Sequence, residues 1–551
     1  MERIRKIVKH PLFVLVVAAL IVAGTFLIEE AWRRYRSKRA FEYDFKVIDE
    51  KILQVYIRYV ARGNVNEVEH SRIVLPTDFN ISNIRVLNGK IIHWSWVPYN
   101  YFYNVYVFEY ETDDRGLFVV EFNYTMKYGV LIVEPNAMFL SPIIYHDEEA
   151  IGSANVFLPF SDVTIIQVSP YPSKIIKERD HLLMKYKWMK SPFRIWIFFR
   201  IMRRGDFVNI TSPPFTFISP RRYIEEAREI LDVYSRAYPL LESLIGVTLN
   251  DVIVQFFVPR VFSETYIIGF VPYRPPPRPN EIYLNLLYFR SFKGMIEYGA
   301  VHELVHNFLI RANITPYGLL WVHEGLAEYL GITITSIVDK EGKYIAGIQK
   351  RKELLERLAS LVGNKYGFVQ EWNPLTSTSQ NIMYYYAVSY IIFRKLVDTY
   401  GGLTVIRKVF SIIRAKGCKV TSTSLFIEIL SEAIGDDVYP LFKEWGFIVV
   451  KRSEVVTVLN TCKELVRSFN IFKYFIERDI YDAEKYLNEG LYLTALTRLH
   501  RAFILIFLGI ALKYLLILNI AYTICFLIML TITKRPEIKG RVLGLIRLLL
   551  S

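Results

Sequence analysis

Two long apolar stretches, one near each end of this 551-residue chain, most strongly limit how it can fold. Residues 11–28 and residues 514–533 carry no charged side chain, and each is about long enough to cross a bilayer as a helix. The chain is 52% hydrophobic, which leaves ample apolar surface for folded cores between them. We therefore expect a transmembrane helix at each end. A cleaved signal peptide is the alternative for the first stretch.

Basic residues beside these stretches predict the topology. They gather before the first stretch and after the second, which places both termini in the cytoplasm and residues 30 to about 510 outside the plasma membrane. The formal net charge is +14, and much of the excess lies beside the apolar stretches, so the expected partner is the lipid bilayer and not nucleic acid. The opposite orientation is favoured by the basic cluster Arg33, Arg34, Arg36, Lys38 and Arg39.

Alternating β-branched and aromatic residues indicate β structure from about residue 41 to 215. The clearest runs are 51–60, 103–110 and 117–124, and turn signals such as Asn88-Gly89 separate them. We expect antiparallel sheets packed as one or two sandwiches.

Helical patterns begin after Ser219-Pro220, where a serine precedes a proline suited to the first helical turn. This helix is expected to end near Gly246. Strand-like segments at 252–258 and 282–286 follow, and the chain then reads as helical to about residue 447. The predicted fold class is α+β.

The sequence His-Glu-Leu-Val-His at 302–306 has the spacing of a metal site. On a helix, His302 and His306 lie four residues apart and face the same way, so two neutral imidazoles can hold one ion. Glu303 lies about 100° round the helix from His302, beside the ion but outside its ligand set. There it can take a proton from a water molecule whose pKa zinc has lowered.

A third ligand is expected from the following helix. Glu324 lies at its start, between Trp321 and Gly325, and would leave one zinc position open for water. Apolar neighbours such as Val301 and Leu304 indicate that the motif helix is buried, where a His-Glu-His group without a metal would be costly.

These two segments, 302–306 and Trp321–Leu330, resemble the zinc helix and the second helix of the gluzincin metallopeptidases of the MA clan, which include thermolysin and the aminopeptidase N-like enzymes. The resemblance covers roughly residues 220–448. It implies a zinc metalloprotease, a hydrolase of peptide or protein substrates, which the two apolar stretches would anchor in the membrane. It further implies one Zn²⁺ per chain on His302, His306 and Glu324, with Glu303 as general base.

The resemblance also implies two supporting residues. Glu328 matches the carboxylate that hydrogen-bonds a zinc histidine in thermolysin-type enzymes, and its alternative reading is an ordinary exposed helix glutamate. The segment 384–396 is similar to the one that carries a tyrosine donor to the oxyanion. Tyr386 fits by register, while Tyr384 and Tyr385 are alternatives.

The chain departs from the aminopeptidase N-like pattern in three ways. Seventeen residues separate His306 from Glu324, where those enzymes have 18. His323 stands where they usually have asparagine and is an alternative ligand. No segment resembles their exopeptidase motif, although Glu281, on a predicted edge strand at 280–284, could bind a free amine or be a plain strand residue. That edge strand could pair with an extended peptide.

Together these patterns predict an N-terminal transmembrane anchor, a β-rich domain, a gluzincin-like, mostly helical catalytic domain with a small sheet, a helical stalk, and a C-terminal transmembrane helix with a cytoplasmic tail. Their expected ranges are 1–40, 41–215, 216–450, 451–510 and 511–551. The alternative function is a catalytically inactive cell-surface binding or scaffold protein with a peptidase-like fold. The substrate, its binding residues, the choice between endo- and exo-cleavage and the oligomeric state are not predicted.

Overall fold

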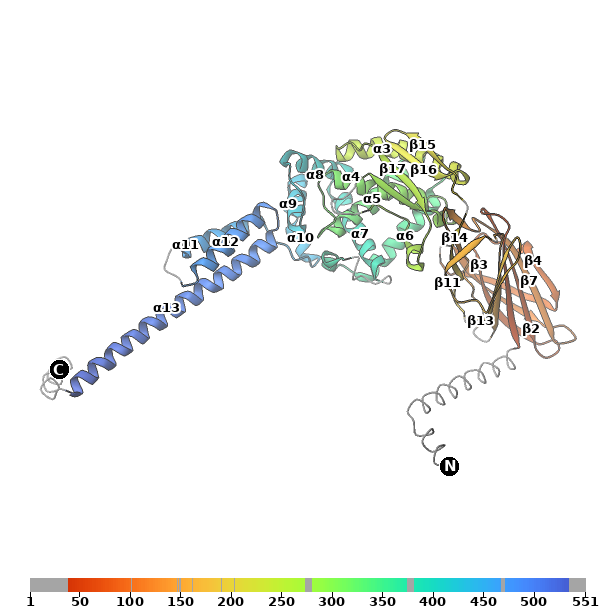
Figure 1. Cartoon of the computed structure of the whole chain (residues 1–551), viewed down its shortest axis with the longest axis horizontal. Helices are drawn as coiled ribbons and strands as arrows, with labels where there is room; N and C mark the ends of the chain where they lie inside the picture. Colours follow the sequence, from red (N-terminus) through yellow and green to blue (C-terminus); the bar gives the residue numbers. More distant parts are fainter. Residues whose placement is uncertain are drawn as a thin grey trace, which may run out of the picture. The chain divides into compact units, whose positions relative to one another are not determined.

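A computed structural model describes residues 38–534 except 101, 146, 148–149, 161, 190, 203, 273–279, 374–380 and 467–470 (Figure 1). The chain is a mixed α+β protein with a β-rich N-terminal region and a helical C-terminal region. The predicted first transmembrane stretch and the predicted cytoplasmic tail lie outside the described residues.

Two compact units make up the described chain. The first runs to Leu240 and also contains Leu249–Asn307 and Leu330–Leu354. The second contains Leu241–Thr248, Phe308–Tyr329 and the residues from Leu355 onward. The division passes through four helices, so single helices contribute to both units.

A β-sandwich forms the start of the first unit. A seven-stranded sheet of order β12-β13-β10-β1-β2-β7-β4 packs against a four-stranded sheet, β11-β14-β9-β8, and a three-stranded sheet, β3-β6-β5. The strands are β1 (Arg39–Val47), β2 (Ile52–Arg62), β3 (Val68–Pro76), β4 (Ile84–Asn88), β5 (Lys90–Pro98), β6 (Tyr103–Glu111), β7 (Leu117–Lys127), β8 (Leu131–Val133), β9 (Asn136–Leu140), β10 (Ile151–Leu158), β11 (Val163–Ser169), β12 (Lys174–Lys177), β13 (Leu182–Met189) and β14 (Trp196–Ile201).

The sandwich core follows from residue alternation along these strands. Phe41, Tyr43 and Phe45 on β1 are buried and share one hydrophobic core with side chains from all three sheets. The expected antiparallel sandwich is present, with one exception. Strand β1, the central strand of the large sheet, pairs in parallel with β10, which is far from it in sequence.

Outside the sandwich, the same unit contains a mixed five-stranded sheet of order β15-β16-β17-β19-β18, which we call the second sheet. Its strands are β15 (Phe207–Ser212), β16 (Phe215–Pro220), β17 (Val252–Phe257), β18 (Gly269–Phe270) and β19 (Glu281–Asn285). The predicted edge strand at 280–284 is therefore wrong, because β19 lies between β17 and β18. The real edge, β18, spans only two residues, too few to show a strand pattern in sequence.

Buried polar contacts hold the sandwich to this second sheet. Arg290 donates from Nε to the carbonyl of Tyr128 at 2.8 Å and from Nη1 to the carbonyl of Leu140 at 2.7 Å. Burial lowers the pKa of Arg290 to about 10. Glu226 receives the ammonium of Lys51 at 3.0 Å and the hydroxyl of Tyr128 at 3.0 Å. These contacts join the sandwich to α3 (Ile224–Ile245) and to the segment that follows β19.

The helices are α3 (Ile224–Ile245), α4 (Met295–Arg311), α5 (Leu320–Val338), α6 (Ile345–Val362), α7 (Ile382–Tyr400), α8 (Leu403–Lys416), α9 (Thr423–Ile434), α10 (Tyr439–Glu444), α11 (Arg452–Leu465), α12 (Lys473–Asn488) and α13 (Tyr492–Lys534). Helix α3 ends as expected before Gly246, whose φ of +73° stops the helix. Helices α4 and α5 are buried on nearly every face, as helices without a polar face must be.

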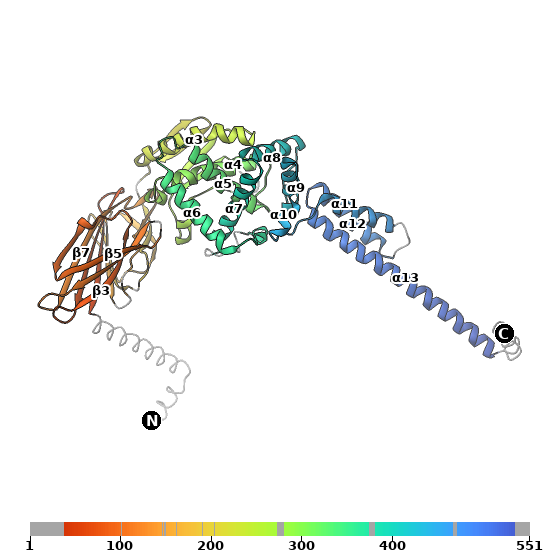
Figure 2. The same cartoon turned by 180° about the vertical axis from the view of Figure 1, so that it is seen from behind.

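Within the described residues, one helix is long and apolar enough to cross a membrane. It is α13, whose most apolar window has a mean hydropathy of 2.4 and is 11% buried. Figures 1 and 2 show α11 and α12 beside the first half of α13, while its second half extends beyond them. The helix continues without a break past Lys513 to Lys534.

Candidate metal centre

Three side chains from α4 and α5 converge on one point. His302 and His306 lie one turn apart on α4, and Glu324 lies in the second turn of α5. One ligand atom from each residue lies within 4.8 Å of the other two, and all three residues are buried. The Nε2 atoms of His302 and His306 are 3.1 Å apart. A His-His-Glu group therefore exists that could hold a metal ion.

The donor set fits zinc. Two imidazole nitrogens bound tetrahedrally at 2.0–2.1 Å would lie about 3.3 Å apart, close to the 3.1 Å separation of the two Nε2 atoms. Two histidines and one carboxylate form the type of ligand set found in catalytic sites, which keep a fourth position for water or substrate. In the described part of the chain, no other cluster of three His, Cys, Asp or Glu side chains meets this geometry.

Glu303 lies beside this group and against the edge strand. Its side chain is 5% exposed. A Cβ added to Gly269 of β18 would lie 2.7 Å from Cγ of Glu303, and one added to Gly299 of α4 would lie 2.1 Å from Cγ2 of Ile268. These two glycines let β18 approach α4 closely. The backbone of β18 is thereby placed next to the predicted general base.

A second residue near Glu303 was not expected from sequence. Tyr234, on α3, is fully buried and stacks on Phe215 with ring centroids 4.8 Å apart. Burial raises the pKa of Tyr234 well above its usual range, and the negative charge of Glu303 raises it further. No sequence pattern marked Tyr234, because the packing of α3 over the second sheet brings it to α4.

Asn285, at the end of β19, fixes the position of the edge strand β18 by three hydrogen bonds. Its side-chain amide donates to the carbonyls of Ile267 at 2.8 Å and Glu264 at 3.2 Å, and its backbone N–H donates to the carbonyl of Ile268 at 2.8 Å. Asn285 is fully buried, and its hydrogen bonds hold the segment that leads into β18 in place. Glu281, on β19, accepts a hydrogen bond from Tyr283 at 3.3 Å.

Two other predicted residues lie on α5. Glu328 is 1% exposed, so it is not a solvent-facing helix glutamate. Burial raises the pKa of Tyr390, and the negative charge of Glu328 raises it further, while the positive charge of Arg394 opposes this increase. His323 is fully buried and its Nε2 lies 3.2 Å from the carbonyl oxygen of Ile314. This contact occupies one of the two ring nitrogens of His323.

The three candidate tyrosines begin α7. Tyr384, Tyr385 and Tyr386 are all partly buried. The ring of Tyr386 meets Trp372 edge-on with centroids 4.8 Å apart, and Tyr385 stacks on the same indole at 5.4 Å. Trp372 thus orders this turn, but these contacts do not select one phenol as the oxyanion donor.

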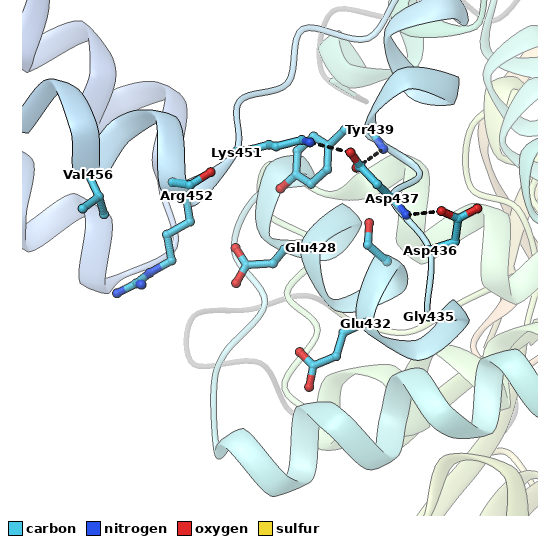
Figure 3. A pocket seen from close by; sticks show the side chains of 11 residues that line it. Glu428, Glu432, Gly435, Asp436, Asp437, Tyr439, Lys451, Arg452 and Val456 are labelled. Atoms are coloured by element: carbon cyan, nitrogen blue, oxygen red, sulfur yellow. Dashed lines mark hydrogen bonds and ion pairs between the residues drawn. The ribbon is translucent and has the colours of Figure 1, made fainter.

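An open hollow lies elsewhere in the second unit, around α9, α10 and the start of α11 (Figure 3). Its volume is about 840 Å³, and acidic and basic side chains line it together. Asp437 pairs with the ammonium of Lys451 and accepts the backbone N–H of Tyr439 at 3.1 Å. The hollow contains no part of the His-His-Glu group.

Comparisons with known proteins give distant similarity. No protein-family model and no curated protein sequence matches the chain. Solved structures that are similar to it include yeast LTA4 hydrolase, with 11% identity, a TM-score of 0.32, and 78% of this chain and 72% of the other covered. An M1 zinc metallopeptidase from Deinococcus radiodurans has 13% identity, a TM-score of 0.28, and coverages of 74% and 94%. Legionella pneumophila aminopeptidase A has 12% identity, a TM-score of 0.31, and coverages of 74% and 49%. These similarities are too distant to show which family the chain belongs to.

Proposed function

We propose that this protein is a membrane-tethered zinc metallopeptidase. The observation that supports it most is the convergence of His302, His306 and Glu324 to within 4.8 Å, with Glu303 buried beside them. A zinc ion bound there would lower the pKa of a water molecule and polarise the scissile carbonyl. The remaining chemistry would be supplied by side chains of α4, α5 and α7.

Glu303 would act as the general base. Held between α4 and β18, it would take a proton from the attacking water and pass it to the leaving amine. Its low exposure keeps bulk water from competing for that proton. The neighbouring Tyr234, buried and uncharged, would keep the wall behind the carboxylate free of competing charge.

Strand β18 would bind the substrate backbone. It is an edge of the second sheet and lies against Glu303 through Gly269. An extended peptide can add to such an edge by main-chain hydrogen bonds. This arrangement would bring the scissile bond past the general base without requiring a free amino terminus.

Tyr386 and Glu328 would complete the centre. The phenol of Tyr386 would donate a hydrogen bond to the oxyanion that forms as water attacks, with Tyr384 and Tyr385 as the alternatives. Glu328, buried one turn after Glu324, would orient a ligand imidazole. Helix α13 would hold the protein in the plasma membrane, with the catalytic domain outside and both termini in the cytoplasm.

The test compares the full-length protein in detergent with Glu303→Gln, using metal analysis and hydrolysis of quenched-fluorescent peptide pools. One pool has blocked termini and the other has free amino termini. We expect one zinc per chain in both proteins and a loss of hydrolysis of about 10²- to 10⁴-fold in Glu303→Gln. Glu353→Gln, an exposed change on α6, serves as the matched control and should hydrolyse like the parent.

Equal hydrolysis by the parent and Glu303→Gln would remove this residue from the mechanism. Zinc binding without hydrolysis of either pool by the parent would favour the alternative, a binding or scaffold protein with a peptidase-like fold. Cleavage of the blocked pool would assign endopeptidase activity, which agrees with a substrate held along β18.

A further inference from the structure

Exposed apolar side chains gather where the start of α12 lies beside α13. We call this group the interfacial band: Ile471, Tyr474, Phe475, Phe503, Ile504, Phe507 and Leu508. Tyr474 is 72% exposed and Ile504 is 60% exposed. The rings of Tyr474 and Phe475 lie 5.6 Å apart, and those of Phe503 and Phe507 lie 4.7 Å apart. Each helix therefore contributes one pair of neighbouring aromatic rings to the band.

Ion pairs between the two helices fix the level of this band. Asp479 of α12 is buried and pairs with Arg498 at 3.5 Å and Arg501 at 3.2 Å on α13. The helices run antiparallel, as Figures 1 and 2 show. At a rise of 1.5 Å per residue, Tyr474 lies about 7.5 Å from Asp479, level with Ile504 of α13. The apolar residues of both helices thus lie at the same height.

The charged side chains along α12 change in kind at the level of the interfacial band. Between residues 471 and 475 the one charged side chain is Lys473, which is exposed. The rest of the helix is net acidic, because Glu477, Asp479, Asp482 and Glu484 outnumber Arg478 and Lys485, and Glu489 follows at the C-terminal cap. An apolar, aromatic and basic layer therefore separates an acidic part of α12 from the apolar part of α13.

The length of α13 beyond this layer matches a bilayer. From Ile504 to Leu530 the helix rises about 40 Å, close to the 40–45 Å of a bilayer with its headgroups. The band then falls in the headgroup region, and Lys513 lies close enough to that region for its ammonium to reach it.

We propose that the interfacial band rests in the headgroup region of an anionic phospholipid bilayer, so that α12 and α13 both contact the membrane. Aromatic side chains favour this region. Lys473, whose ion pair with Glu477 is exposed and 3.8 Å long, and Lys513 would attract anionic headgroups. Two contacts at one height would limit how far the α11–α13 bundle tilts about its membrane helix. The band is continuous with the apolar surface of α13, which favours lipid over a second copy of the chain. This inference rests on the proposed membrane attachment.

The experiment measures the surroundings of single nitroxide labels on the full-length protein. Cys418→Ser and Cys525→Ser remove the partly exposed and exposed thiols, and Cys462 is kept because it is buried. Labels are attached to Tyr474→Cys, Tyr481→Cys or Leu518→Cys, and the protein is placed in vesicles of phosphatidylcholine and phosphatidylglycerol. Collision with oxygen reports lipid, and collision with a neutral water-soluble nickel chelate reports water.

Tyr481 is the matched control, since it is 68% exposed and lies on the same face of α12, about 10.5 Å further from the band. We expect the oxygen-to-nickel collision ratio to be several-fold higher at position 474 than at 481, and high at 518. A water-like ratio at 474 with a lipid-like ratio at 518 would overturn the inference and leave the membrane attachment intact.

Two other outcomes also decide the matter. A label at 474 shielded from both reagents would show that protein covers the band, and the lipid contact would be rejected. A water-like ratio at 518 would reject the membrane attachment itself, and the inference with it.

Discussion

The sandwich and the α4–α5 pair handle buried polar groups in different ways. In the sandwich, a chain of hydrogen bonds and ion pairs connects buried polar side chains to the surface. Tyr59 and Tyr110 share a hydrogen bond of 3.0 Å, Tyr110 donates to Glu69 at 2.7 Å, and Glu69 pairs with Arg39 at 2.9 Å near the surface. On α4 and α5, seven ionisable side chains are buried together: Glu297, His302, Glu303, His306, His323, Glu324 and Glu328.

The α4–α5 pair, unlike the sandwich, buries several His and Glu side chains together at a cost in folding stability. Burying carboxylates is unfavourable unless positive charge or hydrogen bonds compensate them. Lys293 pairs with Glu297 at 2.9 Å, which accounts for one of them. A divalent cation on His302, His306 and Glu324 would supply the charge that the centre needs, whereas the sandwich has no such requirement.

Loss of the metal should affect the α4–α5 centre and leave the sandwich unchanged. We expect chelation, or His306→Ala, to reduce peptide hydrolysis to background and to lower the first unfolding transition, because buried carboxylates lose their counter-charge. Zinc should restore the chelated parent but not the variant. Calorimetry, metal analysis and hydrolysis measure these effects. His181→Ala, on the sandwich, is the control, and retention of tight zinc binding by His306→Ala would contradict the assignment.

Crowding at the edge strand should impair catalysis without releasing metal. Gly269→Ala would place a Cβ 2.7 Å from Cγ of Glu303 and should shift the general base. A displacement of about 1 Å can cost about 10²-fold in rate, so we expect a fall of that order in kcat. Gly331→Ala would meet His302 at 3.3 Å and should cost less. An unchanged kcat in Gly269→Ala, with the variant folded and loaded with zinc, would show that β18 does not constrain Glu303.

The choice among the three tyrosines can be made by kinetics. We expect Tyr386→Phe to lower kcat by about 10²- to 10³-fold with little change in KM, as removal of an oxyanion donor does. Tyr384→Phe and Tyr385→Phe should change kcat far less, since a phenol that does not donate to the oxyanion stabilises no transition-state charge. A large kcat effect in one of those two variants, and not in Tyr386→Phe, would transfer the role to that residue.

The parts of the centre that sequence could predict are those fixed by local geometry. Two histidines four residues apart must share a helix face, and Glu324 follows on the next helix after a short connection. Alternation likewise predicted β2, β6 and β7, because each has a core face and an outer face. Such patterns depend on near neighbours in the chain and survive without knowledge of the tertiary structure.

The parts that could not be predicted depend on how distant segments meet. Strand β18 has two residues and is defined only by its pairing with β19. The closeness of Gly269 and Gly299 to α4 arises from packing, and Tyr234 reaches Glu303 only through the placement of α3. The parallel pairing of β1 with β10 joins segments more than 100 residues apart, which no local pattern reports.

The smallest expected effect belongs to the sandwich and depends on pH. Burial alone would raise the pKa of Glu69, but the hydrogen bond from Tyr110 and the charge of Arg39 hold it below its usual range. A lowered folded-state pKa stabilises the protein above the unfolded pKa of about 4.3, and this stabilisation is lost as pH falls through the folded value. Glu69→Gln should therefore lower the free energy of unfolding by about 1–2 kcal/mol at neutral pH, and by less as pH falls below about 4.

Urea unfolding across this pH range measures the change in the free energy of unfolding, with exposed Glu109→Gln on the same sheet as control. Zinc content and hydrolysis at neutral pH should match the parent, because the sandwich supplies no ligand. Loss of zinc in Glu69→Gln would show that the two regions are not independent.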